Sequence, residues 1–218
     1  MKILLYAVNP IAGGEETELC FEISDGENIE KKKLIITSEM FFELGFPHFP
    51  CGKVEVSCGK LDEIEYLAKK TAAIKRGIYI LSFADNTKKS LARKLVLKGF
   101  SKEIALDAAD HLEKAGYINE IESAKALSRD LAEKKLYGIK RISSSLYEKG
   151  FSRDAIEAAI DEIDVDFHII CGKRIETMGG ASLFSDKDKK QKAIASLMRY
   201  GFSYDDIREG LKYLKKRP

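Results

Sequence analysis

The chain has 218 residues, of which 44% are hydrophobic and 33% are charged, which is the composition of a protein that folds around one or two ordinary cores. No stretch approaches the roughly 20 uninterrupted apolar residues of a membrane span. The acidic residues Glu15, Glu16 and Glu18 follow the short apolar N-terminus, where a signal peptide would need its cleavage site. We therefore expect neither a membrane span nor a secretory signal, and the sequence predicts a cytoplasmic location.

The net charge of +2 conceals an uneven distribution. Residues 1–80 carry 10 basic and 13 acidic side chains, whereas residues 81–218 carry 27 and 22. Within the second part, basic blocks at 87–136 and 186–218 flank an acidic block at 138–185. This arrangement predicts a binding partner that itself has mixed charge.

Residues 1–60 are predicted to form a small β-rich extension. Three short β-prone runs, Ile3–Ala7, Leu19–Ile23 and Lys33–Thr37, are followed by a small helix at 38–44 and an extended Val54–Val56. Asp25 and Gly26 have the residue types of a hairpin turn between the second and third runs. Residues 61–86 are predicted to link this extension to the rest of the chain through a helix at about 62–83.

The four cysteines, Cys20, Cys51, Cys58 and Cys171, form no Cys-x-x-Cys pair, so reduced thiols are expected. His48, Cys51 and Cys58 are close in sequence and could be imagined as zinc ligands. Because the region offers no convincing fourth ligand, we expect these residues to occupy ordinary loop and strand positions. Neither a metal nor a cofactor is predicted.

The strongest signal is an internal repeat with a period of 51 residues. Gly-Phe-Ser begins at Gly99, Gly150 and Gly201. Leucines precede these glycines by four residues, and acidic residues follow the serines by two. Three units at one fixed period indicate a repeat architecture.

Each Gly-Phe-Ser has the chemistry of a corner between two helices. Gly99 is expected at the left-handed position after a helix, Phe100 should pack on Leu95, and Ser101 should cap the next helix. Glu103 then lies in the first turn, where the helix dipole favours negative charge. The equivalent residues in the later units are Leu146, Gly150, Phe151, Ser152 and Asp154, and Leu197, Gly201, Phe202, Ser203 and Asp205.

The corners divide residues 87–218 into three units. A further corner is predicted at Gly116 and Tyr117, where Tyr117 packs on Leu112 and Asn119 with Glu122 has the spacing of a capping box. Gly138 is assigned as another turn glycine. Unit 87–136 is expected to contain helices at 87–98, 101–115 and 119–136, and unit 137–182 helices at 138–149, 152–163 and 165–177. After a loop at 178–182, unit 183–218 contains helices at 187–200 and 203–216 and ends without a third helix.

These repeats resemble the RecX family over about residues 60–218. The matching stretches, in chain order, are Leu91–Phe100, Leu112–Glu120, Tyr137–Ile142, Leu146–Phe151 and Arg199–Ser203 with Asp206–Ile207. The chain departs from the family pattern at Asn119–Glu120, where an acidic pair is usual. The resemblance implies a mainly α fold of tandem three-helix repeats, elongated and curved, with a small N-terminal extension that contains a β-hairpin.

The resemblance also implies a regulator of the recombinase RecA that acts without catalysis. Such a protein would enter the groove of the RecA–single-stranded-DNA filament as a monomer, slow its growth and suppress its ATPase and strand exchange in recombination and the SOS response. Two alternatives remain: a helical-repeat DNA-binding protein that acts independently of RecA, and an enzyme with its site in the β-rich extension. The chain has no P-loop, no Gly-x-Gly-x-x-Gly after a strand and no His-x-x-x-His pair, and His48, His111 and His168 are far apart.

Basic residues are the candidates for contact with RecA or with DNA phosphates, because phosphate contacts are made mainly by Lys and Arg. Aromatic residues do not alternate with them, so sequence-specific DNA recognition is not expected. The candidates are Lys88, Lys89, Arg93, Lys94, Lys98, Lys134, Lys135, Lys140, Arg141, Lys149, Lys189 and Lys190.

Overall fold

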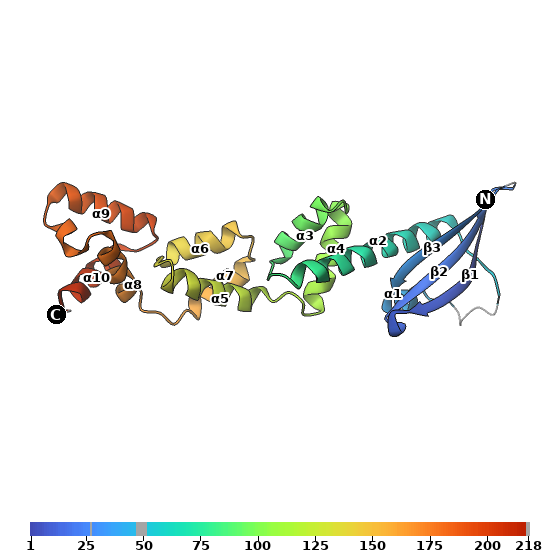
Figure 1. The fold of residues 1–218 in the computed structure, drawn as a ribbon, viewed down its shortest axis with the longest axis horizontal. Helices are drawn as coiled ribbons and strands as arrows, with labels where there is room; N and C mark the ends of the chain where they lie inside the picture. Colours follow the sequence, from blue (N-terminus) through green and yellow to red (C-terminus); the bar gives the residue numbers. More distant parts are fainter. Residues whose placement is uncertain (27, 47–51, 217–218) are drawn as a thin grey trace. The chain divides into compact units, whose positions relative to one another are not determined.

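The computed structural model describes residues 1–26, 28–46 and 52–216, which form two compact units (Figure 1). The first unit consists of Met1–Ala84 and Leu91–Tyr117. The second consists of Asp85–Ser90 and the chain from Ile118 onward. The helix α3 (Lys88–Leu97) therefore gives its first residues to the second unit and the remainder to the first.

The β-rich extension of the first unit is a four-stranded antiparallel sheet with the strand order β3-β2-β1-β4. The three predicted β-prone runs lie in β1, β2 and β3, and Asp25 and Gly26 connect β2 to β3 as predicted. Alternate apolar side chains such as Leu5, Leu19 and Phe21 are fully buried. The strand bounds are β1 Lys2–Ile11, β2 Glu16–Ser24, β3 Ile29–Thr37 and β4 Val54–Glu55.

Two helices follow strands of the sheet in the chain, the short α1 (Ser38–Glu43) and the long α2 (Cys58–Leu81). Helix α2 begins four residues earlier than expected because the Ser57 hydroxyl caps it and accepts a hydrogen bond from the Lys60 amide at 3.2 Å. Although α2 has 24 residues, neither it nor any other helix of the described residues is long and apolar enough to cross a membrane.

The sequence-level zinc hypothesis falls partly outside the described residues, because these do not include His48 and Cys51. Cys58 is not in a loop or a strand but is the exposed first residue of α2. Within residues 1–26, 28–46 and 52–216, no cluster of three or more His, Cys, Asp or Glu side chains could hold a metal ion.

Helices α2, α3 and α4 (Lys102–Lys114) meet at Gly77 of α2. A Cβ atom added to Gly77 would lie 2.4 Å from Cδ1 of Leu112 and 3.6 Å from Cδ2 of Leu91. Leu91 and Leu112 are fully buried. The glycine is therefore required for space, and α2 is a packed part of a three-helix core as well as a link to the extension.

A hydrogen bond between α2 and α4 ties these helices together outside their apolar contact. The Tyr66 hydroxyl donates to the Asp107 carboxylate at 2.5 Å, and this bond is the main reason that the pKa of Tyr66 rises to about 12. We expect Tyr66→Phe to lower the free energy of unfolding by about 1–2 kcal/mol near pH 8. The loss should shrink as the pH rises from about 10 to 12, because the Tyr66 phenol of the unfolded wild-type chain ionises near its ordinary pKa of about 10, whereas that of the folded chain ionises only at about 12.

Urea unfolding at a series of pH values checks this prediction, with Tyr79→Phe as the control because Tyr79 is 54% exposed. A pH-independent difference between Tyr66→Phe and wild type would contradict the assignment of the effect to the Tyr66 hydroxyl.

The second unit contains two helical cores. Ala124, Ile142 and Leu146 are among the buried residues of the first, which is formed by α5, α6 and α7. Cys171, Leu197 and Phe202 are among those of the second, which is formed by α8, α9 and α10. The helix bounds are α5 Glu120–Glu133, α6 Ile139–Glu148, α7 Arg153–Asp161, α8 Phe167–Met178, α9 Lys187–Arg199 and α10 Tyr204–Lys216, all close to the predicted ranges.

The grouping of helices into cores is shifted by one helix relative to the sequence units 87–136, 137–182 and 183–218. Helix α5 packs with α6 and α7, and α8 packs with α9 and α10, so each core takes the last helix of the preceding sequence unit. The helix α8 thus supplies the third helix that 183–218 lacks. The predicted loop at 178–182 is in part the short 3₁₀ helix η2 (Gly180–Phe184).

The predicted helix corners are confirmed. Gly99, Gly150 and Gly201 have φ values of 96°, 89° and 93°, in the left-handed region. The amide of Phe100 donates to the Leu95 carbonyl at 3.3 Å, and the equivalent bonds of Phe151 and Phe202 are both 3.2 Å. The capping hydroxyls of the following helices are those of Ser101, Ser152 and Ser203.

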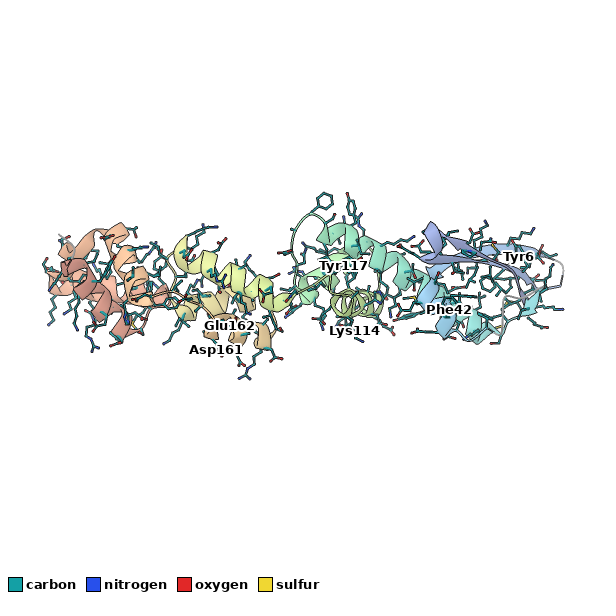
Figure 2. All side chains as sticks on the ribbon, turned by 90° about the horizontal axis from the view of Figure 1, so that it is seen from below. Tyr6, Phe42, Lys114, Tyr117, Asp161 and Glu162 are labelled. Carbon is teal, nitrogen blue, oxygen red and sulfur yellow. The ribbon has the colours of Figure 1, made fainter. Side chains whose placement is uncertain are left out.

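The fourth predicted corner is also present. Gly116 has a φ of 80°, and the Tyr117 amide donates to the Leu112 carbonyl at 2.9 Å. Asn119 caps α5 through the Glu122 amide at 3.1 Å. Unlike the Phe residues of the other corners, Tyr117 is an exposed residue, with 55% of its surface accessible (Figure 2).

Candidate functional site

The start of α3 lies against the Gly150 corner, and we refer to this contact within the second unit as junction 1. The Thr87 hydroxyl donates to the Lys149 carbonyl at 3.4 Å. A Cβ atom added to Gly150 would lie 3.3 Å from the Thr87 hydroxyl oxygen and 3.5 Å from the Lys89 side chain. Junction 1 therefore brings the candidate residues Lys89 and Lys149 together.

Glu120, the first residue of α5, clamps both sides of junction 1. Its carboxylate accepts a hydrogen bond from the Lys88 amide at 2.9 Å and another from the Ser152 amide at 2.8 Å. Both amides belong to first turns or caps of helices, where backbone N–H groups lack a partner in their own helix. In the sequence, Glu120 stands out only as part of a departure from the family pattern, and no local signal indicates that its side chain bonds to residues 32 positions away on either side.

Removal of the Glu120 carboxylate should loosen junction 1. We expect Glu120→Ala to destabilise the second unit by about 1–3 kcal/mol, because two amides lose a charged acceptor, and Glu120→Gln to cost less because one acceptor oxygen remains. Hydrogen exchange at the amides of Lys88 and Ser152 should be faster in the Ala variant. Glu122→Ala is the matched control, and equal exchange rates in both Ala variants would refute the clamp.

The same contact recurs 51 residues later, and we refer to it as junction 2. The start of α6 lies against the Gly201 corner, where the Gly138 amide donates to the Tyr200 carbonyl at 2.8 Å. A Cβ atom on Gly138 would lie only 2.4 Å from the carbonyl carbon and oxygen of Gly201. Gly138 was predicted as a turn glycine, but its φ is −83°, so it is needed for close approach and not for a left-handed turn.

Large side chains fill junction 2. The Arg174 guanidinium lies 3.6 Å from the centre of the Tyr200 ring, and the Tyr137 and Tyr200 rings are 5.9 Å apart. Arg141 lies over Tyr137 at 5.8 Å. Stacks of cations and aromatic rings of this kind contribute both burial and electrostatic attraction.

Junction 1 has smaller or more flexible residues where junction 2 has this stack. Asn86, Ser90 and Lys149 stand 51 residues before Tyr137, Arg141 and Tyr200. They line a cavity of about 500 Å³ together with residues of α5 and the corner residue Phe151. In both junctions a helix start lies against a glycine corner, but the junctions differ in how completely side chains fill them.

Basic residues stand in the first two turns of three equivalent helices, α3, α6 and α9. The pairs are Lys88 with Lys89, Lys140 with Arg141, and Lys189 with Lys190. Positive charge at a helix N-terminus opposes the helix dipole and costs about 0.3–1 kcal/mol per group. The cations of such a helix start favour an anionic ligand, so these positions suit binding better than folding.

The remaining candidates are distributed more widely. Lys134 is paired with Asp130 at 2.8 Å, and Lys135 is exposed after α5. Arg141 approaches Glu148 at 3.9 Å in addition to its contact with Tyr137. In the first unit, Arg93 and Lys94 are exposed on α3, and Lys98 is exposed directly after it.

Lys125, in contrast to the candidates, is a basic residue whose charge is paired within the protein. It lies 2.7 Å from Glu162 and 3.1 Å from Glu122, and hydrogen bonds to these carboxylates raise its pKa. Its side chain is only 16% exposed, so it joins α5 to the end of α7 and is not available to an outside ligand.

Comparison with known proteins gives a consistent result. No protein-family model matches the chain. The regulatory protein RecX of Clostridioides difficile (strain 630) is 30% identical over 160 residues, which cover 71% of each chain. The regulatory protein RecX of Escherichia coli (strain SE11) is 30% identical over 146 residues, 62% of this chain and 86% of that one.

Solved structures share the fold. A crystal structure of regulatory protein RecX aligns with a TM-score of 0.70 over 97% of this chain and 99% of its own, at 16% identity. A crystal structure of RecX from Lactobacillus salivarius aligns with a TM-score of 0.59 over 67% and 97%, at 22% identity. These relatives are named as regulatory proteins and not as enzymes. With its helical repeats, its glycine corners and this degree of sequence identity, the chain belongs to the RecX family of regulatory proteins.

Proposed function

We propose that this chain binds the RecA–single-stranded-DNA filament and restrains its extension, and thereby lowers RecA's ATPase and strand-exchange activities. Membership of the RecX family supports a regulatory role, and the resemblance of the repeats to that family links the role to RecA. The observation that carries the proposal is the recurrence of basic residues at the starts of α3, α6 and α9.

The spacing of charge suits a polymeric partner. Each helix start carries ammonium or guanidinium groups, and such groups bind phosphate or carboxylate oxygens. A filament repeats its phosphates and its protein surface at fixed intervals, so stacked modules can meet several repeats at once. The action proposed is steric and electrostatic and needs no catalytic group, and the protein acts as a cytoplasmic monomer.

The decisive experiment measures RecA's DNA-dependent ATPase with this protein at substoichiometric amounts relative to RecA. Inhibition at such amounts supports the proposal, because a few molecules on growing filaments stop many subunits. Inhibition only at amounts that saturate the DNA would instead favour the alternative, a helical-repeat protein that competes for DNA independently of RecA.

Salt dependence separates phosphate contacts from the rest of the interface. For single strands, the logarithm of the binding constant falls with the logarithm of salt concentration by about 0.7 per phosphate contacted. Filament binding that does not change between low and physiological ionic strength would remove DNA phosphates from the proposed interface.

A further inference from the structure

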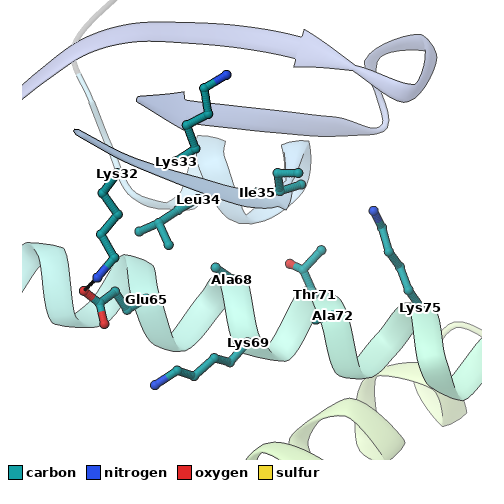
Figure 3. A pocket seen from close by; sticks show the side chains of 10 residues that line it. All are labelled: Lys32, Lys33, Leu34, Ile35, Glu65, Ala68, Lys69, Thr71, Ala72 and Lys75. Atoms are coloured by element: carbon teal, nitrogen blue, oxygen red, sulfur yellow. Dashed lines mark hydrogen bonds and ion pairs between the residues drawn. The ribbon is translucent and has the colours of Figure 1, made fainter. Parts of the chain in front are cut away.

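A groove in the first unit runs between the edge strand β3 and helix α2 (Figure 3). Its volume is about 460 Å³, and all of its lining residues belong to these two elements. None of the candidate residues from the sequence analysis lies in it. The lining residues are Lys32, Lys33, Leu34 and Ile35 of β3, and Glu65, Ala68, Lys69, Thr71, Ala72 and Lys75 of α2.

One wall of the groove is an unused sheet edge. Strand β3 is paired with β2 along all nine residues from Ile29 to Thr37, and it is the outer strand of the sheet. Within the described residues, no strand pairs with its other side. Long edges of this kind are usually blocked, since their free N–H and C=O groups accept an added strand.

The floor of the groove is apolar and shallow. Ala68 and Ala72 lie one helical turn apart on α2, and Leu34 faces them from β3 in Figure 3. Because alanine side chains end at Cβ, they leave room that larger residues would fill. Along α2, residues 65 to 75 span about 15 Å, the length of four or five residues of an extended strand.

The rim of the groove is basic. Four of its lining residues are lysines and one is an acid, Glu65, which holds Lys32 at 2.6 Å. Lys33 points away from α2 in Figure 3 and is paired with Glu18 at 3.1 Å, so the rim consists of Lys32, Lys69 and Lys75, and Lys75 is paired with Glu16 at 2.6 Å. With these acids included the balance is still positive, and Lys69 is exposed beside the alanine floor.

We propose that this groove binds an extended acidic segment of a partner protein, which adds to β3 as a further strand. Main-chain hydrogen bonds to β3 provide affinity, alternate small apolar side chains enter over Ala68 and Ala72, and carboxylates meet the lysine rim. This site is separate from the basic helix starts, so it neither requires nor replaces the filament contact proposed above.

Fluorescence anisotropy with the full chain tests the proposal. The probe is a labelled eight-residue peptide of alternating Glu and Val, and the comparison peptide alternates Lys and Val. We expect saturable binding of the Glu-Val peptide and at least tenfold weaker binding of the Lys-Val peptide. Lys69→Glu and Ala72→Tyr should each weaken Glu-Val binding at least fivefold, whereas Lys102→Glu, an equal charge change on α4, should not.

Two further peptides test strand addition itself. Each carries N-methyl groups on every second residue, one on the odd positions and the other on the even positions. An added strand offers only alternate N–H groups to β3, so one peptide should bind and the other should not. Equal behaviour of the two methylated peptides, or full binding of the Glu-Val peptide to Ala72→Tyr, would overturn the proposal.

Discussion

Alanine at the three corner glycines is expected to destabilise the protein in the order Gly201 most, Gly150 next and Gly99 least. The backbone penalty should be nearly the same at each, about 1–2 kcal/mol, because φ is 93°, 89° and 96°. The surroundings differ. An added Cβ would lie 2.3 Å from the Arg141 amide nitrogen at Gly201 and 3.3 Å from the Thr87 hydroxyl oxygen at Gly150, and it would meet no described atom within 4 Å at Gly99.

The series therefore contains its own control for backbone strain. Gly99→Ala gives the cost of the left-handed conformation, and the excess at Gly201, expected to be 2 kcal/mol or more, measures how tightly junction 2 is packed. Urea unfolding provides the measurement, with hydrogen exchange of residues 91–117 for Gly99→Ala and of residues 118–216 for the other two variants. If Gly201→Ala cost no more than Gly99→Ala, α6 would not rest on that corner in solution.

Charge reversal at the start of α6 is expected to have the largest effect on function. In the double variant Lys140→Glu and Arg141→Glu, four units of charge change in the first turn of α6. We expect the concentration needed to inhibit RecA's ATPase to rise at least tenfold. If both residues contact phosphates, the slope of log affinity against log salt should fall by about 1.4.

Structural damage must be separated from loss of contact, because Arg141 also stacks on Tyr137. The circular dichroism spectrum and the melting temperature of the variant serve for this purpose. A double variant at Lys173 and Lys215, which are exposed on α8 and α10, makes the same charge change elsewhere in the second unit. Full inhibition by the Lys140 and Arg141 variant would exclude this helix start from the interface.

The helices could be predicted from sequence because their ends are encoded locally. At each corner a glycine ends one helix, the following aromatic residue bonds back to that helix, and the serine caps the next helix. Every contact involved lies within about six residues. The prediction was least accurate where a cap was overlooked, as at Ser57, which starts α2 at Cys58 and not near Asp62. Repetition of the pattern at Gly99, Gly150 and Gly201 made the period certain.

The contacts between helices could not be predicted in the same way, because they join distant residues. Gly138 meets Gly201 across 63 positions, and Glu120 joins Lys88 to Ser152. The sequence period gives the length of the repeat but not the boundary between two cores. The sequence units therefore place α5 in 87–136 and α8 in 137–182, whereas each packs in the core formed with the two helices that follow it. Which of the basic candidates bind a partner stays a prediction.

The two junctions also differ in how they can move. Where Arg174 and the rings of Tyr137 and Tyr200 interlock, any displacement of α6 against the Gly201 corner breaks many contacts at once. Where α3 starts, a few hydrogen bonds from Glu120 and Thr87 lie beside a cavity, so a small displacement there breaks fewer contacts than at junction 2. The second unit therefore has one compliant joint and one stiff joint, and thermal bending should concentrate at the compliant one.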